Sequence, residues 1–256
     1  MVKAREPEET RITDTEFRSA IKNAESKIAN ILKDFEASVR TESKAVLVRP
    51  LAEVLNLFDR LTNLHAGFHK RLSIGAVQFD KGNYDRHRPA VDGKLFPDYA
   101  DEISFAALSL NETGAAGTYG QCHLILRTPM IEHRASVFEA NSFEILVKKV
   151  VMLNEDVPKG LRSTWKRRGK LATSKLASAF TELTTKADYP AILDDGDKDF
   201  IEVHVFGKIS HRTIEEVVVV DSGLDDIGKD TANALEKTIA RWTNTIPGWD
   251  THFARI

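Results

Sequence analysis

The stretch Gly117-Thr-Tyr-Gly-Gln-Cys-His-Leu-Ile-Leu-Arg127 carries much of the information about the fold. Within it, Cys122 to Leu126 is an apolar run with the length and composition of a buried strand. The glycine beside Tyr119, at the start of that run, allows another backbone or a ligand to approach closely. Five residues after Arg127, the unit Glu132-His-Arg-Ala-Ser-Val-Phe-Glu-Ala-Asn-Ser142 surrounds strand formers with charged groups, hydroxyls and an amide. Two interpretations are open here: a functional site, or an ordinary hairpin with polar edges.

Further short apolar runs on both sides, interrupted by Gly, Pro and Asn, predict a sheet. Helical spacing appears between Leu161 and Leu183 and from Thr231 to Trp242. Since runs of strands with few helices between them favour segregated layers, the predicted class is α+β with a mixed sheet. Gly82 to Pro97 is polar and rich in turn residues, which predicts a long functional or mobile loop. The predicted strands are Ile74–Phe79, Ile103–Leu110, Cys122–Leu126, Phe143–Leu153, Phe200–Phe206 and Ile214–Val220.

The N-terminal part has helical periodicity. Residues 1–12 are charged and are predicted to be disordered, and Thr13 with Glu16 has the spacing of a capping box. A second helical pattern starts just after Pro50, so residues 13–65 are predicted to form a helical hairpin ahead of an α+β domain at 66–256. The first helix has a near-heptad seam, which covers the sheet or, alternatively, binds a partner or a second copy. The seam residues are Phe17, Ile21, Ala24, Ile28, Ile31, Phe35 and Val39.

Composition narrows the class of protein. With 256 residues, 42% of them hydrophobic, and a net charge of -2, the chain can bury a full core and has no global attraction to nucleic acid or to an anionic membrane. A single cysteine, Cys122, excludes a disulfide framework and a cysteine-based zinc site. No apolar run reaches the length of a membrane span and the N-terminus does not resemble a secretory signal, so we expect a soluble cytoplasmic protein. Standard nucleotide-binding glycine loops, hydrolase elbows and metal-binding histidine motifs are absent from the sequence, so no metal is predicted.

Two further segments carry candidate chemistry. Strand alternation over Asp199–Lys208 places Glu202, His204 and Phe206 on one face, where a carboxylate beside an imidazole could stabilise developing positive charge. Simple edge-strand polarity is the alternative. Lys159–Lys175 contains seven Lys or Arg residues around Trp165 and no acid. Such a segment either grips phosphate and stacks an aromatic ring or is merely solvated.

Three motifs together resemble a known superfamily. They are Tyr119-Gly120 opening a strand that ends in Leu126-Arg127, then Arg134-Ala-Ser-Val-Phe-Glu-Ala-Asn-Ser142, then Phe200-Ile-Glu-Val-His-Val-Phe-Gly207. In this order they resemble a poorly characterised bacterial and phage branch of the ADP-ribosyltransferase toxins. The resemblance implies a mixed sheet split around a nicotinamide cleft and NAD as the substrate of a toxin or effector-like transferase. Asn141 and His204 stand where that branch is expected to have Asp and Gln.

The resemblance also implies residue roles. Glu202 would stabilise an oxocarbenium-like state during ribosyl transfer, as carboxylates do in glycoside cleavage. Tyr119 would stack on the nicotinamide, and His69, chosen over His65, would bind the adenosine ribose. The remaining expected contacts to the dinucleotide come from Arg127, Arg134, Ser136, Ser142 and His204. ADP-ribose would pass to a macromolecular target or to water.

Two other functions are compatible with the sequence. One is a non-enzymatic binding, assembly or antitoxin-like protein that keeps a degenerate transferase-like fold and uses the helical seam or the basic segment. The other is a ribonuclease in which His123, His133 and Arg134 act beside the basic segment, because a pair of histidines can serve as general acid and base.

Overall fold

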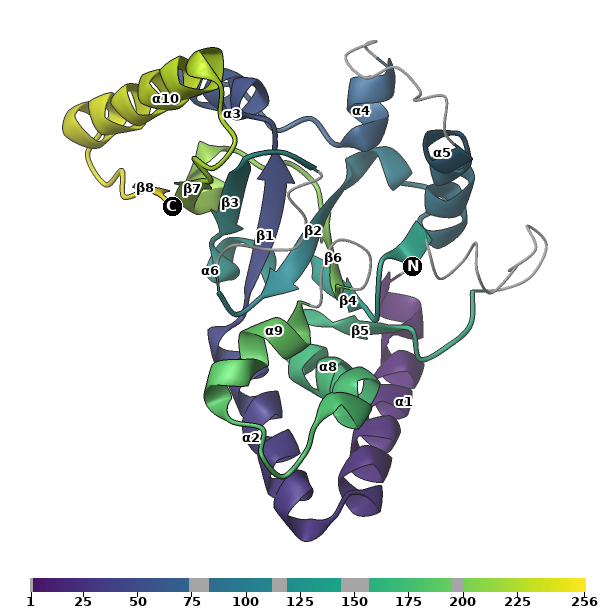
Figure 1. Cartoon of the computed structure of the whole chain (residues 1–256). Coiled ribbons are helices and arrows are strands. Elements are labelled where there is room, and N and C mark those ends of the chain that lie inside the picture. Colours follow the sequence, from purple (N-terminus) through teal and green to yellow (C-terminus); the bar gives the residue numbers. More distant parts are fainter. Residues whose placement is uncertain (1, 74–82, 112–118, 144–156, 195–199) are drawn as a thin grey trace.

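The computed structural model of the chain describes residues 2–73, 83–111, 119–143, 157–194 and 200–256. Its centre is an eight-stranded sheet with the order β5-β4-β6-β2-β1-β3-β7-β8 (Figure 1). Neighbouring strands are antiparallel, except that β8 runs parallel to β7. A mixed sheet with helices packed around it confirms the predicted α+β class.

Four strands coincide with predicted ones: β2 (Ile103–Ser109), β3 (Cys122–Leu126), β6 (Glu202–Phe206) and β7 (Ile214–Val219). Residues 74–79 and 144–153, where two more strands were predicted, lie outside the described residues. Four strands were not predicted because they are short or show no alternation of apolar and polar residues. These are β1 (Lys44–Arg49), β4 (Ala135–Phe138), β5 (Arg162–Thr164) and β8 (His252–Arg255).

Strand β1 corrects the prediction of a separate helical hairpin over residues 13–65. It lies in the middle of the sheet and pairs with both β2 and β3. Its residues Ala45 to Val48 are all buried, because both faces of a central strand are covered. The predicted hairpin and the 66–256 domain therefore share one sheet.

The N-terminal helix is also longer and more broken than predicted. The chain forms α1 (Val2–Asn23) and α2 (Ser26–Glu42), with a break at Ala24 and Glu25 inside the predicted single helix. Residues 2–12 are helical rather than disordered, and two acids hold this part in place. Glu8 pairs with Lys159 (Oε1 to Nζ, 2.9 Å), and the Glu9 carboxylate accepts the backbone N–H of Gly160 (2.9 Å).

The apolar seam of these helices is covered by the chain itself. Helix α8 (Arg168–Leu176) packs against both α1 and α2. Phe35 is fully buried in the main core, and Phe17 and Ile28 are half-buried. The Lys170 ammonium lies over the Phe17 ring, 5.7 Å from its centroid. The seam is therefore in contact with α8 and with the sheet, as expected if it covers the sheet rather than a partner.

The sheet separates two apolar layers. One face contacts the main core, which includes Leu32, Leu47, Leu124 and Val203. Besides α2 and α8, the helices on that side are α3 (Leu51–Asp59), α9 (Tyr189–Leu193) and α10 (Asp226–Thr245). The other face, near β2, β4 and β6, packs against α5 (Asn83–Leu95) through a second cluster with Phe96. The shorter helices α4 (Phe68–Ser73) and α6 (Thr128–Ile131) flank the sheet.

Helix α5 replaces the predicted loop over Gly82–Pro97. Its sequence contains Pro89 and Gly93, both of which disfavour helix interiors. Packing overrides this local preference, because Val91 and Leu95 are buried in the second cluster. The helix thereby brings its polar residues over the strand that carries Glu202. Among the described residues, no helix has the length and apolar character needed to cross a bilayer.

A buried Glu–Arg–Asp cluster between β6 and α5

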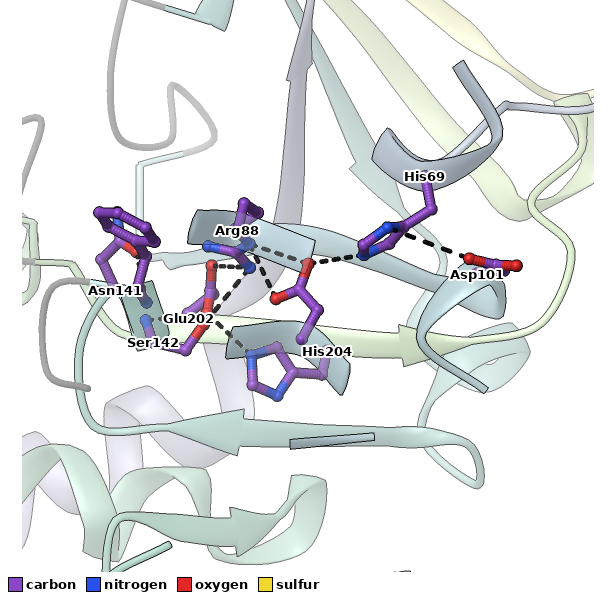
Figure 2. Close-up of polar contacts among 9 residues, drawn as sticks. His69, Arg88, Asp101, Asn141, Ser142, Glu202 and His204 are labelled. Carbon is purple, nitrogen blue, oxygen red and sulfur yellow. Dashed lines mark hydrogen bonds and ion pairs between the residues drawn. The ribbon is translucent and has the colours of Figure 1, made fainter. Parts of the chain in front are cut away.

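Glu202 is the centre of a buried polar cluster (Figure 2). It is 3% exposed and lies at the start of β6, facing away from the main core, as strand alternation predicted. Its Oε2 accepts the backbone N–H of Ser142 (3.1 Å) and a hydrogen bond from His204 Nε2 (2.8 Å). Its Oε1 faces Arg88 Nη2 at 3.5 Å.

These contacts keep the carboxylate charged. Burial raises the pKa of Glu202, but the charge of Arg88, the hydrogen bond and charge of His204 and the hydrogen bond from Ser142 together lower the pKa to about 2. Glu202 is therefore an anion at neutral pH, held by donors of fixed orientation.

His204 lies two residues after Glu202 on the same face of β6. Rings of Phe96, Phe105 and Phe138 surround it, with centroids 5.0 to 5.7 Å away. Burial lowers the pKa of His204 more than the Glu202 carboxylate raises it, so the imidazole is neutral at neutral pH. Since Glu202 can only accept, Nε2 carries the proton and Nδ1 keeps its lone pair. Among the described residues, that buried Nδ1 has no hydrogen-bond partner.

Helix α5 contributes Arg88 and Asp92, which are four residues apart and so lie on one face of the helix. Arg88 Nε donates to Asp92 Oδ2 (3.0 Å) and Nη2 donates to the Ser142 hydroxyl (3.3 Å). The guanidinium also lies over the Phe105 ring, 4.0 Å from its centroid. Arg88 therefore joins two buried carboxylates, those of Glu202 and Asp92.

His69, on α4, reaches this cluster only indirectly. Its Nε2 lies 2.8 Å from Asp92 Oδ2, and its Nδ1 lies 4.0 Å from the exposed Asp101 carboxylate. Side-chain contacts thus connect His69 to Asp92, Asp92 to Arg88 and Arg88 to Glu202 in one continuous series (Figure 2). This chain of contacts contains two carboxylates, one guanidinium and two imidazoles.

Of the other predicted site residues, Ser142 joins the cluster. Asn141 supports it, because its Oδ1 accepts the Phe143 N–H (3.1 Å) and so shapes the turn that directs the Ser142 N–H at Glu202. An amide oxygen performs this turn contact, so the Asn found in place of the expected Asp is compatible with the local geometry.

Tyr119 and Arg127 do not join the cluster, which corrects their predicted grouping with Glu202. Tyr119 precedes β3, which lies three positions from β6 in the sheet, or about 14 Å at typical strand spacing. Arg127, at the other end of β3, pairs with Asp250 (2.6 and 3.1 Å) and donates to the Arg212 carbonyl. Order along the chain suggested proximity, but β1 and β2 are inserted between β3 and β6.

The histidines of the nuclease alternative are separated as well. His123 is buried on β3, and His133 is exposed just before β4. Strands β3 and β4 are four positions apart in the sheet, about 19 Å. These two histidines are therefore too far apart to act on one phosphate.

Arg134 and Ser136 line a pocket of about 480 Å³ that also includes His204. Its other walls include Phe96, Tyr99 and Phe206, and its basic side is formed by Lys166 and Arg167. Much of the basic segment Lys159–Lys175, for which phosphate binding and simple solvation were both open, is paired within the chain. Asp14 accepts from both Arg167 and Lys170, and burial of Arg168 lowers its pKa to about 10 while it donates to Ser43 and to backbone carbonyls.

Arg88 and Asp92 are the residues that sequence reasoning missed. Their four-residue spacing was visible, but Gly82, Pro89, Gly93 and Pro97 indicated a loop, in which that spacing has no meaning. In the described ranges, no group of three or more His, Cys, Asp or Glu side chains is arranged to hold a metal ion. No protein-family model and no curated protein matches this sequence.

Proposed function

We propose that this protein cleaves the bond between nicotinamide and ribose in NAD and transfers the ADP-ribose to a macromolecule or to water, with Glu202 as the catalytic carboxylate. The observation that carries this proposal is the state of Glu202: an ionised, 3% exposed carboxylate held by Ser142 and His204. Such a group can stabilise a positive charge that develops during the reaction without first having to reorganise.

The two oxygens of Glu202 differ in their surroundings, which suggests separate tasks. Oε2 is fixed by two hydrogen bonds, whereas Oε1 faces Arg88 Nη2 at 3.5 Å, the longest of the three distances. A ribose hydroxyl could replace that contact, because Arg88 is also held by Asp92 and Ser142. In this proposal Oε1 faces the substrate, and Oε2 fixes the orientation of the carboxylate.

The proposed reaction needs negative charge at this place. As the C1′–N bond breaks, its electron pair passes to the nicotinamide nitrogen, which loses its positive charge while the ribose gains one. The nucleophile, water or a target side chain, then forms the new bond at C1′ and loses its proton to solvent. The ionised Glu202 carboxylate favours this cation, and burial strengthens the effect.

The test is the release of nicotinamide from NAD by the purified chain. Glu202→Gln keeps the shape of the side chain and removes its charge, so we expect a fall in turnover of about 10²-fold or more. Glu215→Gln is the matched control: Glu215 lies on β7, is half-exposed and pairs with Lys44 (2.8 Å). This control should leave turnover unchanged.

Thermal unfolding of both variants separates a loss of chemistry from a loss of fold. A wild-type protein that neither binds NAD nor releases nicotinamide would remove the proposal. Equal turnover in the wild type and in the Glu202 variant, both folded, would remove Glu202 from the reaction.

A further inference from the structure

We infer that the pocket beside β4 and β5 binds a hydroxylated aromatic carboxylate, with its hydroxyl at Ser136 and Thr164 and its carboxylate at Lys166. The pocket has a volume of about 480 Å³, which lies within the range of small-ligand sites, about 300 to 1,000 Å³. Glu202 is not among the residues that line it. The inference therefore does not rest on the proposed transfer reaction.

The register of the sheet separates this pocket from the Glu202 cluster. Phe138 on β4 is opposite Glu202 on β6, and Ser136 is opposite His204 one step further along the same face. That step is two residues, or about 7 Å. The pocket begins at the second pair and continues away from Glu202. One face of the sheet thus carries the buried polar cluster and, beside it, a separate cavity.

Two hydroxyls form a polar part of the pocket lining. Ser136 on β4 is opposite Thr164 on β5, so their side chains lie next to each other on one face of the sheet. Within the described ranges, neither hydroxyl has a hydrogen-bond partner. Ser136 is 5% exposed, yet both residues line the pocket, and neither oxygen is among the fully enclosed unpaired atoms of the described residues. Both hydroxyls are therefore available to a ligand that can donate or accept a hydrogen bond.

Aromatic side chains form walls of the same pocket. Phe96 and Tyr99 line it from the segment after α5, and Phe206 lines it from the end of β6. The rings of Tyr99 and Phe206 meet at an interplanar angle of 71°, with centroids 5.6 Å apart. Phe206 is 42% exposed, so part of an apolar ring reaches solvent. Such walls favour a flat aromatic ligand, which packs against other rings by its edge or its face.

The lining also contains cations. Lys166 is exposed and has no ion pair within the described parts of the chain. Arg134 uses Nε and Nη1 for two backbone carbonyls, which leaves Nη2 available to an anion. Arg167 is already paired with Asp14. Lys166 and Arg134 are therefore the groups that can hold a carboxylate by charge-assisted hydrogen bonds.

The charge and the length of the ligand follow from two further observations. Glu132 is exposed and lines the same pocket, so it repels a second negative charge and favours a carboxylate over a phosphate monoester. Ser136 and Arg134 are two residues apart on one edge of the pocket, about 7 Å along the strand. One benzene ring with substituents at opposite ends spans such a distance. A para-hydroxyphenyl acid therefore fits both polar parts of the lining.

Calorimetric titration of the full chain tests the site with three probes: para-hydroxyphenylpropionate, phenylpropionate, which lacks the hydroxyl, and para-hydroxyphenylpropionamide, which lacks the charge. We expect loss of the hydroxyl to weaken binding about fivefold, the effect of one hydrogen bond. Loss of the charge should weaken binding about tenfold, because a charge-assisted hydrogen bond is lost.

Substitutions at the two ends of the pocket locate these effects. The double variant Ser136→Ala and Thr164→Val removes both hydroxyls, so it should bind the two acids with equal affinity, a result that a general loss of structure would not give. Lys166→Met should weaken both acids about tenfold. Lys237→Met, exposed on α10 and outside the lining, is the matched control and should have no effect. Thermal unfolding shows whether the variants fold, and if the double variant does not, the three probes with Lys166→Met still decide.

Four results would overturn the inference: no binding at millimolar para-hydroxyphenylpropionate, equal affinity of the wild type for the two acids, a double variant that keeps the preference, or Lys166→Met equal to the wild type. A titration in excess NAD separates this site from the proposed enzyme. The acid should bind with unchanged affinity, whereas its displacement by NAD would assign the pocket to the dinucleotide and also overturn the inference. Failure of the enzyme is measured separately, as absence of nicotinamide release.

Discussion

Replacing Arg88 by Met removes the only cation that joins Glu202 and Asp92 in the described structure and leaves both carboxylates buried. Lowering the pKa of Glu202 from 4.5 to about 2 corresponds to about 3 kcal/mol of stability at neutral pH, and Arg88 is the largest of the stabilising causes. Breaking a buried ion pair from one side typically costs about 3 to 5 kcal/mol. We therefore expect Arg88→Met to lower the free energy of unfolding by about 3 kcal/mol at pH 7.5.

The pH dependence identifies the cause. In the wild type the folded pKa of Glu202 is depressed, so its contribution is complete above pH 4.5 and is lost as the pH falls towards 2. Without Arg88 that pKa rises, and the variant regains relative stability on acidification, because protonation removes the unpaired charge. The difference between the wild type and the variant should therefore shrink between pH 7.5 and pH 4.

Urea unfolding followed by circular dichroism at these pH values measures both quantities. Arg127→Met is the matched control, because its Asp250 partner is exposed and such pairs contribute about 0 to 1 kcal/mol. A loss of equal size at every pH would show that packing of the guanidinium on Phe105, not its charge, was removed. A loss below about 1 kcal/mol at pH 7.5 would refute the reasoning altogether.

Two further predictions concern packing and reactivity. Gly169 lies where α8 meets α2, and a Cβ there would stand 2.4 Å from the Glu36 carbonyl oxygen, so Gly169→Ala should destabilise the protein by about 1 to 3 kcal/mol. Gly93→Ala on α5, where a Cβ has open space, should be neutral or slightly stabilising. Thermal unfolding compares the two variants. Burial raises the pKa of the Cys122 thiol to about 12, so the native protein should react with a thiol reagent at pH 8 far more slowly than the protein in urea, and equal rates would contradict its burial.

Regular patterns in the sequence predicted the corresponding elements well. The alternation around Glu202 gave the correct face for every residue of β6, because one side of that strand meets the apolar core and the other a polar cluster. The final helix was found from its periodicity, although it begins earlier, at Asp226, with the Asp225 side chain accepting the Gly228 N–H.

Elements without a regular pattern were missed for physical reasons. Strand β1 is buried on both faces, so it shows no alternation and is easily assigned to the neighbouring helices. Helix α5 contains Pro89 and depends on tertiary packing rather than on local helix preference. The positions of Arg88 and Asp92 on one face of a helix could therefore not be predicted from the sequence. The order of strands in the sheet is likewise set by long-range pairing, so the distance between Tyr119 and Glu202 could not be predicted from the sequence.

The central place of β1 affects how the chain must fold. Residues 44–49 pair with residues 103–109 and 122–126, so an early segment gains its hydrogen bonds only after long loops have closed. Strand β6 follows both β2 and β4 in the chain but lies between them in the sheet, so it must be inserted later still. Such topology predicts slow folding compared with helical proteins of similar stability. On the ribosome, Glu202 is added only when about four-fifths of the chain has been synthesised, so the sheet stays open between β2 and β4 until then.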